Sequence, residues 1–132
     1  LFCIIVIQPF KKYGNALSDS PKIIKSKEFA LQIIKVCNYV KQTKKESVLT
    51  NQLIRSGTSV GANINEAIYG NSKADFISKL HISLKETGES IYWLTLLKRT
   101  NLIEYNFDEL LSLAEEIKRM LIASLNTAKE NK

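Results

Sequence analysis

Apolar residues recur at spacings of three and four along four long segments, and this period constrains the fold more than any other feature. The segments cover about residues 23–44, 47–69, 73–99 and 107–128. A spacing of three and four places apolar side chains on one face of an α-helix, whereas a strand requires alternation. With two prolines and five glycines in 132 residues, little interrupts these helices. The chain is therefore expected to be all-α.

Short polar breaks separate the four segments and carry signals for helix ends. Gly70 follows the second segment, and Ser72 is placed to cap the third helix, with Asp75 three residues later. Asn106 is placed to cap the fourth helix, with Glu109 in the equivalent position. Because short connections force neighbouring helices to run in opposite directions, the pattern predicts an antiparallel up-down-up-down four-helix bundle.

The first 22 residues differ from the rest of the chain. They open with an apolar run over residues 1–7, which is far shorter than the ~20 residues that span a bilayer. We expect residues 1–22 to be an extension and residues 23–132 to form the bundle domain, with no membrane partner. Cys37 is expected to be a reduced core thiol, as in a cytoplasmic protein.

The positive charge is concentrated in the first third of the chain. The net charge is +6. Residues 1–45 hold nine lysines and two acids (9 − 2 = +7), and residues 46–132 hold ten basic and eleven acidic groups (10 − 11 = −1). A local basic excess attracts phosphate, although lysines can also form an ordinary solvated face. The candidate nucleic-acid-binding residues are Lys22, Lys25, Lys27, Lys41, Lys44 and Lys45.

The second predicted helix carries a polar stripe beside its apolar stripe. Its members are Gln52, Arg55, Ser59, Asn63 and Glu66. In register, these side chains can form a hydrogen-bonded ladder, or they can be the ordinary boundary of a surface helix. Arg55 and Glu66 lie too far apart along the helix to pair, so each needs a partner elsewhere.

The third predicted helix is apolar on two faces. Its main stripe is Phe76, Leu80, Leu84, Ile91 and Leu94. Ile82 and Trp93 point elsewhere, alongside Glu86 and Glu89. A helix in a four-helix monomer needs one apolar stripe, and tryptophan is favoured at interface centres, so this second face predicts association with another chain. Glu86 and Glu89 are then candidates to pair with Arg55 of a neighbouring copy.

The sequence offers little for catalysis. His81 is the only histidine, so neither a Ser/His/Asp triad nor a Cys/His dyad with flanking motifs can be assembled. The di-iron pattern of helical bundles requires two Glu-x-x-His motifs, which the sequence lacks. We therefore expect no enzymatic activity, no catalytic residues, and no metal or cofactor site.

Residues 52–67, which read QLIRSGTSVGANINEA, resemble the central motif of the bacterial 23S rRNA intervening-sequence proteins. The segments SKADFI (72–77), SLKE (83–86) and YWL (92–94) extend the resemblance, which covers about residues 24–129. Arg55, Ser59, Asn63 and Glu66 fall inside the central motif, which implies a structural or interface role for them.

The resemblance also implies an assembly and partners. Members of this family are four-helix bundles that form ring-shaped homopentamers, and genes for some lie within insertions in 23S rRNA genes. In a related branch, the accessory proteins of diversity-generating retroelements, a basic surface binds nucleic acid and a reverse transcriptase. The implied partners are thus further copies of the chain, RNA or DNA, and a reverse transcriptase.

Two functions follow as hypotheses. The first is a non-enzymatic, homo-oligomeric accessory protein that binds nucleic acid through a basic surface. The alternative is a protein–protein interaction scaffold with no nucleic-acid role.

Overall fold

The computed structural model describes residues 20–130, which form four α-helices and no strand. The helices are α2 (Pro21–Lys44), α3 (Val48–Ile68), α4 (Lys73–Thr100) and α5 (Phe107–Glu130). The prediction of an all-α chain with four helices is confirmed, and each helix begins and ends within about two residues of its predicted bounds. The apolar run at residues 1–7 lies outside the described residues.

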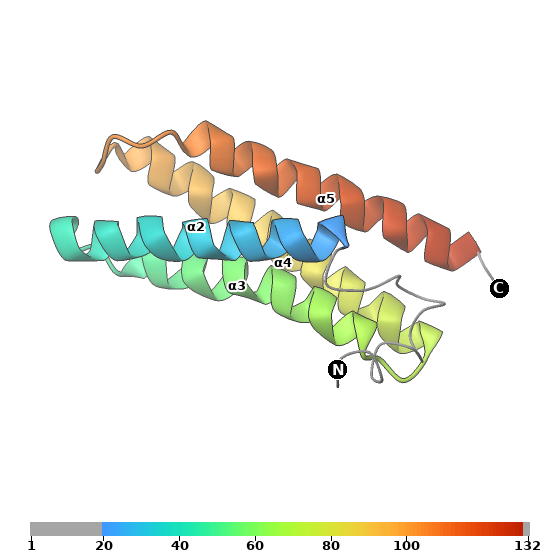
Figure 1. Ribbon diagram of the computed structural model, residues 1–132. Coiled ribbons are helices and arrows are strands. Elements are labelled where there is room, and N and C mark those ends of the chain that lie inside the picture. The colour runs from blue at the N-terminus through green and yellow to red at the C-terminus, as the bar shows by residue number, and fades with distance from the viewer. Residues whose placement is uncertain (1–19, 131–132) are drawn as a thin grey trace.

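The four helices pack lengthwise against one another, and the chain turns back at each connection (Figure 1). α3 lies against α4 and α2, while α5 lies against α4 and, less extensively, against α2. The α2–α3 and α4–α5 connections share one end of the bundle, and the α3–α4 connection lies at the other end (Figure 1). None of the described helices is long and apolar enough to cross a bilayer.

The core contains large apolar side chains from all four helices. Its largest fully buried members are Phe29, Ile33, Val40, Leu53, Val60, Ile64, Leu80, Leu94, Leu97, Leu110, Ile117 and Leu121. Cys37 is also fully buried, as predicted for a core thiol. Burial of each large apolar side chain contributes roughly 1.5–3 kcal/mol, so this core is the main source of stability.

Small hydroxyl side chains fill the contact between α3 and α4. Ser90 donates to the Ser56 hydroxyl at 2.8 Å, and Ser83 donates across to the Val60 carbonyl at 2.7 Å. All three serines are buried, and no buried side-chain nitrogen or oxygen among the described residues lacks a partner. Short side chains let the two helices approach closely, and the hydrogen bonds offset the cost of burying the hydroxyls.

Two glycines of α3 allow α2 to lie close. A Cβ on Gly57 would come within 2.6 Å of the Ile33 Cδ1 atom. A Cβ on Gly61 would lie 3.0 Å from the Ser26 hydroxyl oxygen. These two glycines therefore let α3 and α2 approach closely.

Side chains satisfy exposed amides at the starts of α4 and α3. The Ser72 hydroxyl accepts from the Asp75 amide at 3.1 Å, which confirms the predicted cap of α4. The carboxylate of Glu46 caps α3 by accepting from the Leu49 and Thr50 amides at 2.7 and 3.1 Å. This negative charge also lies favourably at the positive end of the helix dipole.

Candidate functional site

Arg55 of α3 joins two carboxylates of α4. Its guanidinium donates to both oxygens of Glu86, at 3.3 and 3.1 Å, and also to Glu89. The Glu89 carboxylate accepts a further bond from the Trp93 indole at 3.1 Å. We call Arg55, Glu86, Glu89 and Trp93 the Arg55 cluster.

The cluster favours its charged forms. Hydrogen bonds to Glu86 and then to Glu89 raise the pKa of Arg55 above its usual value. The bond from Trp93, followed by the bond from Arg55, lowers the pKa of Glu89. The Arg55 side chain is 49% exposed, so water screens these interactions and the cluster acts mainly to orient its members.

The Arg55 cluster corrects one prediction. Arg55 was expected to pair with Glu86 and Glu89 of a neighbouring copy, and it pairs with those residues of its own chain. The reason is geometric, because α3 and α4 are the most closely packed pair of helices and bring these side chains level with one another.

Ser59 and Asn63 of the polar stripe bond locally and do not form a ladder between side chains. The Ser59 hydroxyl donates to the Arg55 carbonyl at 2.7 Å, and the Asn63 amide donates to the Ser59 carbonyl at 2.9 Å. Both bonds run back one turn along α3, as is common for short polar side chains in helices. Glu66 pairs with Lys79 of α4 at 3.1 Å, which gives it the partner elsewhere that it required.

Apolar surface remains exposed beside the cluster. Ile82 is 38% exposed and Tyr92 is 58% exposed, while Trp93 is half-buried. The rings of Tyr92 and Trp93 meet edge to face with centroids 5.0 Å apart. The second apolar face predicted for this helix is therefore left partly uncovered in a single chain.

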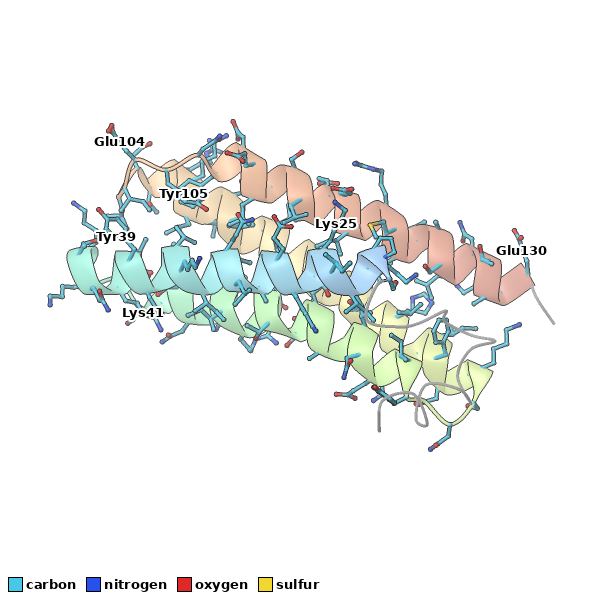
Figure 2. All side chains as sticks on the ribbon, viewed as in Figure 1. Lys25, Tyr39, Lys41, Glu104, Tyr105 and Glu130 are labelled. Carbon is cyan, nitrogen blue, oxygen red and sulfur yellow. The ribbon has the colours of Figure 1, made fainter. Side chains whose placement is uncertain are left out.

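The six candidate lysines do not form one patch. Lys22, Lys25 and Lys27 lie near the start of α2, whereas Lys41, Lys44 and Lys45 lie at or just past its end. Figure 2 shows Lys25 and Lys41 at opposite ends of the helix. At 1.5 Å per residue, Lys25 and Lys44 are roughly 28 Å apart along the axis.

Only some of these lysines are available to a partner. Lys25 pairs with Glu116 of α5 at 3.2 Å. Burial lowers the pKa of Lys22. Lys44 and Lys45 are exposed at the α2–α3 turn, and Lys27 is exposed near the start of α2.

An open groove of about 400 Å³ runs between α2 and α3. Its lining consists mainly of short side chains and includes Ser26, Ala30, Gly61 and Ala62, with Lys27 also contributing. The groove exists because small residues on facing helices leave space above the close contact at Gly61. It holds no cluster of titratable groups.

The described residues offer no arrangement suited to covalent or metal chemistry. No group of three or more His, Cys, Asp or Glu between residues 20 and 130 is placed to hold a metal ion. Burial raises the pKa of Cys37 to about 12, so its thiol is protonated at neutral pH and is a poor nucleophile.

Sequence reasoning missed several polar and aromatic residues on the surface of α4 and α5. Lys79, the partner of Glu66, the exposed residues Lys85 and Tyr92, and the partly buried Lys118 were not among the candidates. Counting charge along the chain hides such residues, because acids on the same segment cancel them.

The chain is similar to proteins of one family. Residues 22–123 match the family model described as 23S rRNA-intervening sequence protein. A crystal structure from Bacteroides thetaiotaomicron, described as a protein with unknown function from the S23 ribosomal protein family, is 43% identical with a TM-score of 0.76. The alignment covers 79% of this chain and 97% of that chain. No curated protein matches.

Proposed function

The chain belongs to the family of 23S rRNA-intervening sequence proteins, and on that premise we propose that it is a non-enzymatic accessory protein associated with RNA. In this proposal the bundle is antiparallel and up-down-up-down, and several copies form a ring, of five by family analogy. RNA or DNA binds through a basic surface, and a reverse transcriptase is a further partner by the same analogy. The reduced core thiol of Cys37 is consistent with a cytoplasmic location.

The family match carries this proposal, and two features of the molecule support it. The chain has a net charge of +6, which attracts a polyanion. The partly exposed Ile82 and Trp93 provide an apolar surface that a second copy would cover. Neither feature requires a catalytic group.

Light scattering combined with an RNA titration tests the proposal. We expect a mass several times the 15.0 kDa of one chain at micromolar concentration, and RNA binding that weakens steeply with salt. A monomer would contradict the assembly. Absence of binding at about 50 mM salt, or binding that does not change with salt, would contradict the association with RNA.

A protein–protein scaffold is the second candidate function, because the α2–α3 groove offers short side chains against which a helix could pack. Ala62→Gln would fill this groove with little effect on the core. If that variant abolishes a native protein complex while the chain binds no RNA, the scaffold is the better description.

A further inference from the structure

The outward side of α4 carries cations and an exposed aromatic ring. His81, Lys85, Gly88, Tyr92 and Arg99 lie within about 60° of one another around the helix axis. All five are exposed. Tyr92 stands against the edge of Trp93, and this contact restricts the motion of its ring.

Contacts with α3 and α2 show which sides of α4 and α5 face each other. The Glu86 side of α4 faces α3, because Glu86 bonds Arg55, and the side that carries Lys98, about 120° around the helix from Glu86, faces α5 through Asp108. In the same way the Glu116 side of α5 faces α2, through Lys25. Lys118 lies about 160° around α5 from Glu116, which turns it towards α4.

The ion pair between Lys98 and Asp108, at 2.7 Å, sets the register of α4 and α5. The two helices run in opposite directions from this pair (Figure 1). Ten residues before Lys98 is Gly88, and ten residues after Asp108 is Lys118. Equal rise per residue therefore brings Gly88 and Lys118 to about the same level.

The exposed side of α4 and the neighbouring part of α5 carry a net positive charge once the ion pairs within the chain are counted. Arg55 engages Glu86 and Glu89 of α4, and Lys98 engages Asp108. On the exposed side of α4 and the neighbouring part of α5, Lys85, Arg99, Lys118 and Arg119 make no ion pair. Glu104, Glu109 and Glu115 are the carboxylates of the α4–α5 connection and the first half of α5 that make no such pair, so the cations are in excess.

Gly88 has no role in packing within the chain. A Cβ at this position would meet nothing within 4 Å, whereas a Cβ on Gly57 would meet Ile33. Glycine is the least favourable residue in a helix interior after proline, so folding alone does not explain it. A bare stretch of helix lets an external molecule approach the backbone closely.

We propose that the α4–α5 face, defined as Lys85, Gly88, Tyr92, Arg99 and Lys118, binds a single-stranded nucleic acid. The three cations contact phosphates, an unpaired base stacks on Tyr92, and the strand passes close to the helix at Gly88. The combination of an exposed ring with cations favours a nucleic acid over an acidic protein, which would not need the stacking surface. This inference rests on the proposed function and names its binding surface.

Fluorescence anisotropy of a labelled 20-nucleotide oligouridylate, titrated at several salt concentrations, tests this inference. Lys85→Gln/Lys118→Gln is expected to weaken binding at least about tenfold at low salt and to reduce the salt slope by about 1.4, since each lost phosphate contact on a single strand removes about 0.7. Lys35→Gln, at an exposed lysine on α2, is the control and should shift the slope little. Circular dichroism checks that each variant is folded.

A second pair of variants tests stacking apart from charge. Tyr92→Ala is expected to weaken binding by roughly 5- to 100-fold, and Tyr92→Phe is expected to retain it, because the ring face and not the hydroxyl stacks on a base. Equal loss in the two variants would overturn the role of the ring.

The outcomes separate this inference from the proposed function. If the Lys85→Gln/Lys118→Gln variant binds normally while the Lys44→Gln/Lys45→Gln variant loses the salt slope, the α4–α5 face is not the binding surface. The association with RNA then stands. If the unaltered chain binds no oligonucleotide at any salt concentration, both proposals fail. If a 20-residue polyglutamate displaces the oligonucleotide as well as unlabelled oligouridylate does, the face binds acidic chains generally and the inference is overturned.

Discussion

Arg55 holds together two carboxylates that would otherwise repel each other, because Glu86 and Glu89 lie one turn apart on α4. We expect Arg55→Ala to lower the free energy of unfolding by about 1 kcal/mol, a small value because water screens the half-exposed guanidinium. Urea denaturation at neutral pH measures the change. Arg55→Ala in a Glu86→Gln/Glu89→Gln background is the control, and an equal loss there would show that the ion pairs contribute nothing.

The lowered pKa of Glu89 gives the Arg55 cluster a defined pH dependence. The usual glutamate pKa is 4.5, so this carboxylate contributes stability above pH 4.5 that is lost as the pH falls through its lower folded value. Glu89→Gln is therefore expected to be less stable than the unaltered chain at pH 7 and to lose less stability between pH 7 and pH 3. Parallel curves of stability against pH would contradict this.

Gly88 and Gly57 form a matched pair for the same substitution. Gly88→Ala is expected to raise the free energy of unfolding by about 1 kcal/mol, because alanine is the better helix former and its Cβ meets open space. Gly57→Ala is expected to lower it, because the new Cβ would overlap Ile33, which is fully buried and cannot move without disturbing the core. Thermal denaturation of the two variants side by side shows whether the unfolding midpoint rises for Gly88→Ala and falls for Gly57→Ala.

At the scale of the helix, the start of α3 depends on one side chain. Glu46→Ala removes an acceptor from two amides and is expected to lower the free energy of unfolding by about 1 kcal/mol. This loss corresponds to a thermal unfolding midpoint that is lower by about 4 °C. Glu104→Ala makes the same change of charge at an exposed position of the same bundle end, so a similar shift there would implicate net charge instead of the cap.

Helix bounds and the Ser72 cap were predictable from the sequence because they depend on local spacing and on the residues that begin and end a helix. The buried face of α4 was less predictable. Leu84 and Ile91 were assigned to the main stripe, yet they are partly buried at its edge, and the centre of the contact holds Ser83, Thr87 and Ser90. Buried hydroxyls have no hydropathy signal, and Ser83 and Ser90 bond partners on α3 that the spacing of residues in α4 does not reveal.

Interactions between distant segments were the least predictable part of the candidate site. Arg55 and its carboxylate partners were recognised, but a sequence cannot distinguish a partner on the same chain from one on a neighbouring copy. The lysines were recognised as a group because they are close in sequence, although the length of α2 separates them in space. Both errors arise because distance along the chain was taken as a guide to distance in the fold.

For the whole molecule, the exposed apolar surface of α4 sets the expected behaviour in solution. Ile82→Glu would place a charge in that surface and is expected to shift the assembly towards the 15.0 kDa monomer. Leu31→Glu, on the exposed side of α2, is the control and should leave the mass unchanged. Sedimentation of the two variants at equal concentration gives the comparison, and a reversal of the two results would place the interface on α2.

The burial of Cys37 in α2 provides a native reporter of how often the bundle opens. A thiol reagent reacts with the thiolate, and this sulfur is both shielded and held in its protonated form, so alkylation has to wait until α2 separates from its neighbours. With the other cysteine of the chain, Cys3, replaced by serine, the labelling rate at rising denaturant would follow that separation in the otherwise unmodified protein. The same rate measured with bound oligonucleotide would show how much the ligand slows the opening of α2, a helix that contributes no residue to the α4–α5 face.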